Sequence, residues 1–474
     1  MKASDHFLNR FFYPESIAIV GATNNPANLN TPLMKNLVRL GFRGKLYPIN
    51  PKENEIMGLK AFPNLQSVPN QVDLVVTAVP ATRTQEIIKG CDEIGVRNIV
   101  IISGGFSEGG SDGQKLHQDL RSFFKEKGIR ALGPNTLSPI NTSENLAISY
   151  HALKSLRKGN LSLAFQSGFY EPKLSWIFSH LGINKILDMG NKMNINEVDA
   201  LEYFALDAST EIIAMHIESL HGNGRDFFNI LKQVSLEKPT IILKSGRTQS
   251  GSRAASSHTG SLAGENNLIF DSMLRQTAAI QAHSIEEFFD FAKVFQYVEL
   301  PKGNRMALIP YSGGEGVMAT DACEINGFKM ANLSKQGEQQ VRKIAPPWEG
   351  SSLNPFDAGF CFQFFFTNLS FFFKTLAVIP KDENVDCTVM QLPPPWLYNS
   401  IIPMTEGLGD EYIDIMLAMN DESGKPFALW CTTMDAREME FVQRIEAHNI
   451  PVFPSSIRAI KSLAALYRYS IRHK

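Results

Sequence analysis

The sequence has few cysteines, no long apolar run and no excess of charge of either sign. Five cysteines are scattered over 474 residues without a CxxC pair, which argues against a disulfide framework and a zinc cluster. No apolar run reaches transmembrane length, and residues 1–16 are too polar for a signal peptide. Lys and Arg number 46 against 48 Asp and Glu, so the balance predicts neither a nucleic acid nor a membrane as partner. These absences favour a cytoplasmic protein.

Short apolar runs rich in valine and isoleucine alternate with amphipathic stretches of helical period. Fully apolar strands between helices indicate parallel sheets covered on both faces, which predicts an α/β fold. Several runs end in Gly, Ser or Asn, and ligands of open α/β sheets bind at that edge. The expected strands are residues 16–22, 73–79, 98–105, 161–168, 211–217, 239–246 and 305–314.

The chain length predicts about three domains. One boundary is expected near residue 150, before a new strand, and another near residue 300, in the connector ELPKGNR. The Phe-rich residues 359–373 are interpreted as a buried helix face, with a partner contact as the alternative. We therefore expect units at 1–150, 151–300 and 301–474.

The first unit opens with IAIVGATNN, the pattern of a strand, a tight loop and then a helix. Gly21 permits a close backbone approach, and a helix N-terminus can bind a phosphate. Because Gly21 is the only glycine of the loop, the full G-x-G-x-x-G dinucleotide pattern is absent. The segment alone is equally compatible with an ordinary turn and with an anion-binding loop.

A series of motifs follows: YPINPK at 47–52, VP at 79–80, SGGFSE at 103–108 and GPN at 133–135. Their order and spacing resemble the CoA-binding domain of the succinyl-CoA ligase α subunit and, more closely, of ADP-forming acetyl-CoA synthetases. The resemblance implies a Rossmann-like domain that binds coenzyme A. The residues that it assigns to CoA are Gly21, Ala22 and Thr23 at the phosphates, Asn50, Pro51 and Lys52 at the nucleotide end, Val79 and Pro80 beside the adenine, and Ser103 and Asn135.

The segment KSGRTQSGSRAASSHTGSLAG (244–264) is rich in small residues around one histidine, His258. Small residues allow motion and let backbone N–H groups approach an anion. Neutral imidazole is a suitable nucleophile for a phosphoryl group near pH 7. Composition alone favours a flexible linker that happens to contain a histidine. The string SSHTGSLAG, however, is similar to the phosphohistidine loop of the same family, which implies that His258 is phosphorylated.

Two further groups follow from this resemblance. A phosphohistidine needs an orienting group on its other ring nitrogen, and Glu218 occupies the family's position for it. The phosphoryl group needs oriented donors, for which the turn after residue 165 matches the family's S-Q-S-G. The implied phosphate-binding residues are Gln166, Ser167, Gly168, Ser257, Thr259 and Gly260. The remaining histidines His216, His221 and His283 lack a metal-ligand spacing and are interpreted as structural or surface residues, so we expect no metal ligands on this chain.

The third unit begins PYSGGEGV, similar to the family's N-A-G-G-x-G strand and loop, and NPFDAG at 354–359 resembles its N-P-x-D motif. The resemblance implies two flavodoxin-like, succinyl-CoA synthetase-like domains after the first. The glycines at 313–316 are either a plain turn or a second phosphate or partner contact.

The chain departs from the family at the presumed reaction centre. Phe169-Tyr170-Glu171-Pro172 replaces small residues after the S-Q-S-G turn, and Phe165 replaces its first serine. Thr136 and Ser138 replace a cysteine and a glycine of GPNCLG. These changes leave the acyl group open and make a catalytically drifted, CoA-binding regulator the alternative to an enzyme.

The resemblance implies the α subunit of an acid–thiol ligase that interconverts acyl-CoA, ADP and phosphate with carboxylic acid, CoA and ATP. An acyl phosphate and a phosphohistidine at His258 are the intermediates. Because no ATP-grasp domain is apparent, ADP or ATP with Mg²⁺ is expected to bind mainly to a separate ATP-grasp β subunit. The expected assembly is α2β2 or an α dimer. A nicotinamide-dependent dehydrogenase is disfavoured, because Asn50-Pro51-Lys52 follows the second strand where an acidic residue is needed.

Overall fold

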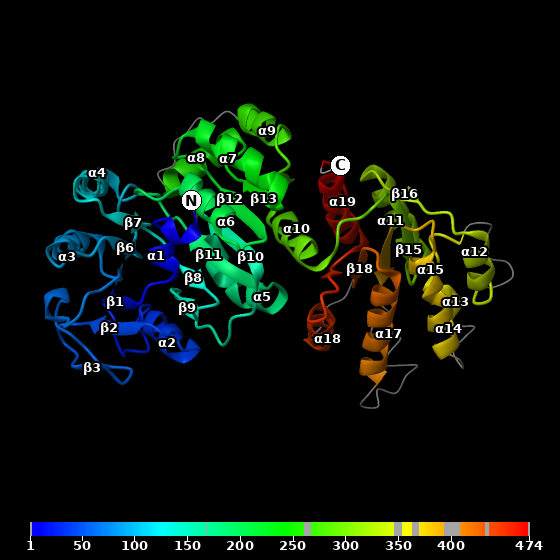
Figure 1. Cartoon of the computed structure of the whole chain (residues 1–474), viewed down its shortest axis with the longest axis horizontal. Coiled ribbons are helices and arrows are strands. Elements are labelled where there is room, and N and C mark those ends of the chain that lie inside the picture. The colour runs from blue at the N-terminus through cyan, green and yellow to red at the C-terminus, as the bar shows by residue number, and fades with distance from the viewer. Residues whose placement is uncertain are drawn as a thin grey trace. The chain divides into compact units, whose positions relative to one another are not determined.

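The computed structural model describes residues 2–166, 168–259, 267–345, 353–362, 369–392, 408–431 and 436–472. Contacts divide the chain into two compact units, residues 1–283 and 284–474. Unit 1 contains two large sheets and unit 2 contains one, each flanked by helices (Figure 1). Nearly all strand pairs in these sheets are parallel, which confirms the α/β class. None of the described helices is long and apolar enough to cross a membrane.

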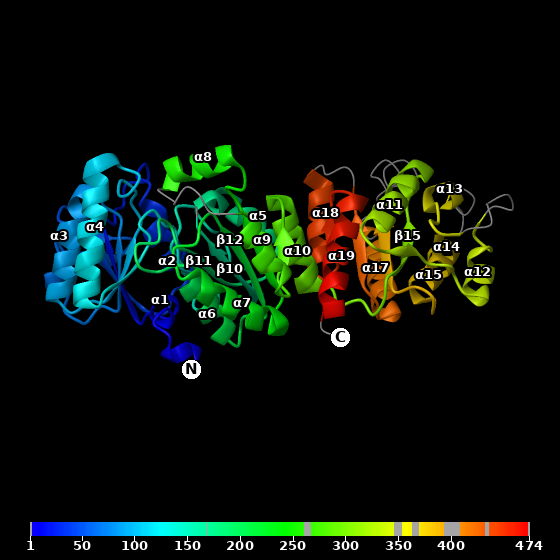
Figure 2. The same ribbon diagram turned by 90° about the horizontal axis from the view of Figure 1, so that it is seen from above.

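The first sheet of unit 1 is fully parallel, in the order β2-β1-β5-β6-β7. Alternate residues of β1 face opposite layers: Ile17 and Ile19 pack with helix α2, and Ala18 and Val20 with helices α3 and α4. Figure 2 shows α3 and α4 together on one side of this sheet. The elements are η1 (Ala3–Asp5), α1 (Asn9–Phe12), β1 (Ser16–Val20), α2 (Thr31–Leu40), β2 (Lys45–Ile49), β3 (Glu55–Ile56), β4 (Leu59–Lys60), η2 (Leu65–Ser67), β5 (Leu74–Thr77), α3 (Ala81–Glu93), β6 (Asn98–Ile101), α4 (Gly110–Lys127) and β7 (Arg130–Leu132).

The second sheet of unit 1 runs in the order β14-β13-β12-β10-β11-β8-β9, and only its β8–β9 edge is antiparallel. The strands β8 and β9 precede the boundary expected near residue 150, yet they pair with this sheet. The elements are β8 (Ile140–Asn141), β9 (Leu146–Ala147), β10 (Lys158–Phe165), η3 (Gly168–Lys173), α5 (Leu174–His180), β11 (Ile183–Asp188), α6 (Glu197–Leu206), β12 (Ile212–Ile217), α7 (Gly224–Glu237), β13 (Thr240–Lys244), α8 (Gln249–Thr259), α9 (Asn267–Arg275) and β14 (Ile280–Ala282).

Unit 2 is built on a parallel sheet in the order β16-β15-β17-β18-β19. Helix α19 packs on β17 and β18 and against α10 and α11. The elements are α10 (Ile285–Tyr297), β15 (Arg305–Ile309), α11 (Gly313–Ile325), β16 (Lys329–Met330), α12 (Lys335–Val341), α13 (Ala358–Phe362), α14 (Leu369–Leu376), α15 (Val378–Lys381), β17 (Cys387–Gln391), α17 (Leu408–Ser423), β18 (Phe427–Trp430), α18 (Ala436–Glu446), β19 (Val452–Phe453) and α19 (Ser456–Arg472).

Two features of unit 2 refine the sequence interpretation. The glycines at 313–316 lie in the first turn of α11, where the Ser312 hydroxyl accepts the N–H of Glu315 and caps the helix. In the Phe-rich stretch, Phe372 and Phe373 are buried, whereas Phe360 and Phe371 are about 40% exposed. Its described part is therefore a helix surface that is buried on one side only.

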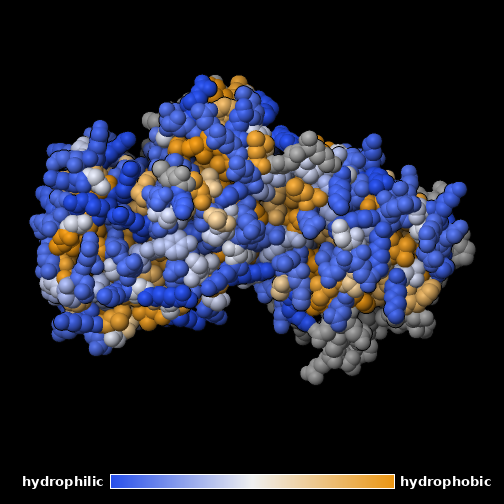
Figure 3. All heavy atoms as spheres, in the orientation of Figure 1, coloured by the Kyte–Doolittle hydropathy of each residue, from blue (hydrophilic) through white to orange (hydrophobic). Residues whose placement is uncertain are grey.

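Hydrophilic residues cover most of the visible face, with smaller apolar areas between them (Figure 3). All five cysteines are described and buried, and none of them forms a disulfide. The apolar strands predicted from the sequence thus form the interior of each sheet, and the thiols are part of the packed core.

Candidate functional site

The residues assigned to CoA lie at one edge of the first sheet, because each follows the carboxyl end of a parallel strand. Gly21-Ala22-Thr23 follows β1, Asn50-Pro51-Lys52 follows β2, and Val79-Pro80 follows β5. Ser103 follows β6 and Asn135 follows β7. The parallel order of the sheet therefore brings all of these positions to the same edge.

Gly21 lies where only glycine fits. Its φ of 91° is in the left-handed region, and a Cβ at this position would stand 2.8 Å from the carbonyl oxygen of Ala78. The Asn30 side chain donates to the carbonyl oxygens of Gly21 and Ala78, at 3.1 and 2.8 Å. The helix expected after a tight loop begins only at Thr31, so residues 21–30 form a longer loop that Asn30 holds against the ends of β1 and β5.

A carboxylate lies against this loop. The Thr23 hydroxyl donates to Glu53 Oε1 at 2.8 Å, and Asn24 donates to Glu53 Oε2 through its backbone N–H and its side chain, at 3.2 and 3.0 Å. Asn50 Nδ2 donates to the carbonyl oxygen of Ala22 at 2.8 Å and to Glu53 Oε1 at 3.2 Å. Glu53 was missed from the sequence, because in the polar run KENE it looks like a solvated surface acid.

The other end of the edge is formed by the turns after β6 and β7. The Asn135 N–H donates to the carbonyl oxygen of Ser103 at 3.0 Å, and Asn135 is exposed with a φ of 60°. The Ser103 hydroxyl is buried and has no hydrogen-bond partner among the described residues. Pro80 is the exposed N-cap residue of α3, next to the half-buried Val79. Asn135 and Pro80 are accessible to a ligand lying along the edge, whereas the Ser103 hydroxyl is not.

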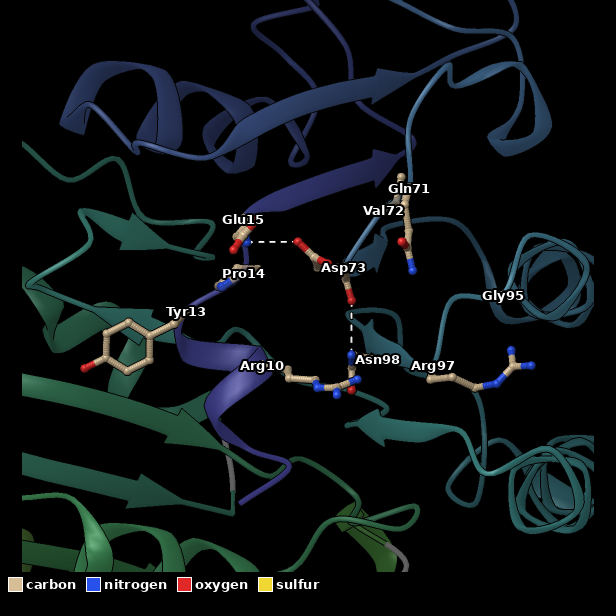
Figure 4. A pocket seen from close by; sticks show the side chains of 10 residues that line it. All are labelled: Arg10, Tyr13, Pro14, Glu15, Gln71, Val72, Asp73, Gly95, Arg97 and Asn98. Carbon is tan, nitrogen blue, oxygen red and sulfur yellow. Dashed lines mark hydrogen bonds between the residues drawn. The ribbon is translucent and has the colours of Figure 1, made fainter. Parts of the chain in front are cut away.

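A cavity of about 220 Å³ lies at the opposite, amino-terminal edge of the same sheet (Figure 4). It is lined by Asp73 and Asn98 at the starts of β5 and β6 and by the chain leading into β1. Asp73 accepts the N–H groups of Glu15 and Ser16, both at 3.0 Å, which explains it as the anchor of the first strand. This cavity is separate from the edge that carries the residues assigned to CoA.

The second sheet brings the predicted phosphate turn against the turn that carries Glu218. Gln166, which follows β10 and is 2% exposed, accepts the N–H groups of Glu218 and Ser219 through Oε1, at 2.8 and 3.0 Å. Its Nε2 donates to the Ser219 hydroxyl at 3.1 Å. The side chain of Gln166 thus fixes the backbone of the turn after β12.

Two buried lysines hold the same turn from other sides. Lys244, at the end of β13, donates to the carbonyl oxygen of Glu218 at 2.6 Å. Lys192 donates to the carbonyl oxygen of Ser219 at 2.5 Å and to Glu197 at 2.6 Å. Glu197 in turn accepts the N–H groups of His221 and Gly222, both at 2.8 Å. We call residues 218–222 the Glu218 turn. Its backbone is hydrogen-bonded by the side chains of Gln166, Lys192, Glu197 and Lys244, which lie far apart in the sequence.

These cations set the local electrostatics. Burial opposes ionisation of Glu197, yet its pKa is lowered because Lys192 is its partner. Burial, together with Lys192 and Lys244, lowers the pKa of His216 to about 3, and burial and Lys192 lower that of His221 to about 4. Both histidines are therefore neutral near pH 7, as structural residues. The positive charges of Lys192 and Lys244 favour the binding of an anion at this site and disfavour a further positive charge.

Several residues of the predicted phosphate site lie outside what can be described. Ser167 and Gly260 are outside the described residues, and of Ser257, His258 and Thr259 only the backbone is described. The backbone of these three residues belongs to α8, so residues 249–259 form a helix where a loop was expected. The Thr248 hydroxyl accepts the N–H of Gly251 at 3.0 Å and caps the first turn, which supports a helix despite the small residues.

Helix α8 begins beside the Glu218 turn. A Cβ placed on Gly246, whose φ is 68°, would lie 3.7 Å from Ala255 Cβ and 3.8 Å from the carbonyl oxygen of Glu218. Gly168, by contrast, has open space around it and is the first residue of η3. The structure thus brings α8, the Glu218 turn and Gln166 together at the carboxyl edge of the second sheet.

The bulky residues that depart from the family are mostly absorbed by the core. Phe165 and Tyr170 are fully buried and stack at 4.3 Å between ring centroids, and the Tyr170 hydroxyl donates to the carbonyl oxygen of Leu137. Phe169 is only partly buried, with its ring 4.6 Å from that of His216. Of the three aromatic substitutions, Phe169 is therefore the one that can shape a binding surface.

The other departures, Thr136 and Ser138, surround Asp188. Both hydroxyls donate to the carbonyl oxygen of Asp188, at 2.5 and 3.1 Å. The Asp188 carboxyl accepts the N–H groups of Leu137 and Gly190, but burial prevails and raises its pKa to about 7. These residues link the segment after β7 to the end of β11.

Two family models match successive parts of the chain. A CoA-binding domain family matches residues 15–141, and a family of succinyl-CoA ligase-like flavodoxin domains matches residues 158–295. The fold and the two family matches thus define a protein of the succinyl-CoA ligase class with a CoA-binding domain.

Individual relatives are more specific. The α subunit of the ADP-forming acetate–CoA ligase I of Pyrococcus furiosus is 32% identical over 474 residues, with 98% of each chain covered. The ADP-forming acetate–CoA ligase II of Archaeoglobus fulgidus is 31% identical over 98% of this chain, which spans 67% of its length. A solved acetyl-coenzyme A synthetase 1 of Ca. Korarchaeum cryptofilum, described as dinucleotide-forming and complexed with phosphate and ADP, has a TM-score of 0.83 at 30% identity, with 98% of this chain and 97% of that chain covered. The chain belongs to the ADP-forming acyl-CoA synthetases, a family of acid–thiol ligases.

Proposed function

We propose that this chain is the α subunit of an ADP-forming acyl-CoA synthetase, with CoA on the first sheet and a phosphohistidine at His258. The observation that carries the proposal is the Glu218 turn, held by Gln166, Lys192 and Lys244 beside helix α8. Buried side chains that fix a strand-end turn so tightly are typical of a site that must present one side chain in one direction. The relative of equal length is itself named a subunit alpha.

The reaction consists of three reversible transfers. Phosphate attacks the thioester carbonyl of acyl-CoA, a C–O bond replaces the C–S bond, and CoA leaves as the thiol. A His258 ring nitrogen then takes the phosphoryl group of the acyl phosphate, which releases the carboxylate. Finally an ADP oxygen takes the phosphoryl group from the imidazole and forms ATP.

The residues of the second sheet have separate roles in this scheme. The Glu218 carboxylate orients the imidazole of His258 and stabilises the positive ring, while Gln166, Lys192 and Lys244 hold its backbone. Donors from Ser167, Gly168, Ser257, Thr259 and Gly260 hold the phosphoryl group. The buried ammonium groups add a positive potential that stabilises its negative charge.

The CoA and nucleotide sites are separate in this proposal. CoA lies along the carboxyl edge of the first sheet, from Gly21 to Asn135. ADP or ATP, with Mg²⁺, binds mainly to a partner β subunit of the ATP-grasp type. This is supported by the Pyrococcus relative, named as one subunit, and by the Archaeoglobus relative, of which this chain spans two thirds.

The acyl group need not be acetate. Relatives of the family carry names for acetate, 4-hydroxybutyrate and trans-ferulate. The acyl phosphate must reach His258, so residues beside the Gln166–Gly168 turn contact its acyl end. Phe169 is the partly exposed aromatic residue there, and we expect it to select the acyl group.

The test uses the chain alone, because the first two transfers need no nucleotide. The chain is incubated with ³²P-phosphate and a panel of acyl-CoA thioesters. We expect acid-labile, alkali-stable label on the peptide that contains His258, and none in H258N. The matched control H283N replaces an exposed histidine and should label like the original protein. Failure of every thioester to label the chain would favour the CoA-binding regulator instead.

A further inference from the structure

The Glu53 carboxylate occupies hydrogen-bond donors at the place where the CoA phosphates are expected. The Thr23 hydroxyl and Asn50 Nδ2 donate to Oε1, at 2.8 and 3.2 Å. The N–H and Nδ2 of Asn24 donate to Oε2, at 3.2 and 3.0 Å. Both carboxylate oxygens therefore accept two hydrogen bonds each.

Three of the four donors belong to the loop after β1, and the fourth, Asn50, follows β2; the proposed function assigns both segments to CoA. Thr23 is 91% buried, whereas Asn24 and Lys52 are exposed, so the donor set opens to the outside on one side. All four donors are neutral, and hydrogen bonds rather than an ion pair hold the carboxylate among the described contacts. Neutral donors converging on one anion suit a phosphate oxygen equally well.

A carboxylate and a phosphate cannot share these donors. Two like charges about 4 Å apart repel by roughly 1 kcal/mol in water and by about 4 kcal/mol near a protein surface. We propose that Glu53 is an affinity-determining residue that occupies the phosphate donors in the ligand-free chain and must leave them when CoA binds. This inference rests on the proposed CoA site.

The consequence is a reduced apparent affinity. When the binding-competent state is a minor one, the observed Kd rises by the inverse of its population. A glutamine at position 53 removes the negative charge and turns an NH₂ group toward donors that need an acceptor, which favours the open state. An alanine removes the side chain entirely.

The experiment is calorimetric titration of CoA into the full chain and into the variants E53Q, E53A and E55Q. Glu55 is the matched control, because it is exposed and two residues away, and its carboxylate makes no hydrogen bond or ion pair with any described residue. We expect E53Q and E53A to bind CoA about tenfold more tightly than the original chain, and E55Q to bind within about twofold of it.

Three outcomes would overturn the inference. Equal or weaker binding by E53Q and E53A would mean that Glu53 builds the site rather than occupying it. Equal tightening by E55Q would show a general effect of net charge. Absence of CoA binding in the original chain and all variants would overturn the CoA site itself, and circular dichroism of each variant establishes that it is folded.

Discussion

Lys244 ends an apolar strand and places its ammonium group under the turn that carries Glu218. Lys244 is 3% exposed and donates to the carbonyl oxygens of Glu218 and Ser245, at 2.6 and 2.8 Å. A buried carbonyl that loses its partner costs about 1–3 kcal/mol. Lys244 is therefore a positioning residue, which holds the backbone of the turn in place.

Replacing Lys244 by methionine should keep the apolar stem and lose both hydrogen bonds. We expect the free energy of unfolding of K244M to be about 2 kcal/mol lower than that of the original chain. We also expect His258 of this variant to be labelled at least about tenfold more slowly. The measurement is the rate of ³²P labelling at a temperature where the variant is fully folded. K232M, which changes an exposed lysine of α7, is the control. Labelling of K244M at the original rate would assign Lys244 a purely structural role.

Asp188 gives unit 1 a pH-dependent stability. Its pKa is raised by burial from 3.8 to about 7, so between these values the folded chain holds a proton that the unfolded chain has released. The contribution of Asp188 is fully present below pH 3.8 and is lost as the pH rises to about 7. At about 1.4 kcal/mol for each pKa unit, the loss amounts to at most about 4 kcal/mol.

The variant D188N should lack this component. Urea unfolding of the original chain and of D188N is compared at pH values from about 4.5 to about 8, with the exposed D119N as control. We expect the stability difference between D188N and the original chain to shift in favour of D188N as the pH rises to about 7, and to be constant above that. A difference independent of pH would contradict the raised pKa.

At the scale of elements, the loop from Gly21 to Asn30 joins the ends of β1 and β5. Gly21 needs its left-handed conformation and also the space that a Cβ would take from Ala78. Gly41, the C-cap of α2, has a φ of 75° with nothing within 4 Å of a Cβ. Substituting Gly41 therefore introduces backbone strain alone, whereas substituting Gly21 introduces both strain and a steric clash.

Alanine at either position costs about 1 kcal/mol for the strained φ. In G21A the contact of 2.8 Å adds a displacement of the loop, and we expect CoA affinity to fall at least about tenfold. In G41A the affinity should be unchanged. Calorimetric titration of both variants checks this, and similar CoA binding by G21A and G41A would argue that the loop does not hold the phosphates.

At the scale of the whole molecule, the proposed function requires a second chain that binds the nucleotide. In that proposal the first sheet binds CoA, the second sheet carries the phosphohistidine, and a β subunit binds the nucleotide. We expect the purified chain to form phosphohistidine from acyl-CoA and phosphate but to show no net ADP-dependent turnover. Addition of an ATP-grasp partner should restore ATP formation. Robust turnover by the chain alone, in a coupled ATP assay, would refute the separate subunit.

The fold class could be predicted from the sequence, and so could the common edge at which the residues assigned to CoA lie, because both follow from local patterns. Apolar runs such as residues 16–22 and 239–246 contain the strands β1 and β13. A parallel sheet then places the residues after its strands at one edge, whatever the details of packing. The domain boundaries and the roles of the site residues stay predictions.

Local patterns were insufficient where packing decides. Residues 249–259 read as a loop by composition but form a helix capped by Thr248, and Phe165 and Tyr170 read as pocket residues but stack in the core. Small and aromatic residues are compatible with several environments, and their neighbours in space decide between them.

The sequence by itself determined the order of strands and turns, and it singled out His258 through a short motif. Only the tertiary structure decided that Lys192, Glu197 and Lys244 converge on the Glu218 turn, and that Glu53 turns back onto the loop after β1. The physical reason is that buried polar groups must find hydrogen-bond partners, and those partners come from distant segments that no local pattern connects.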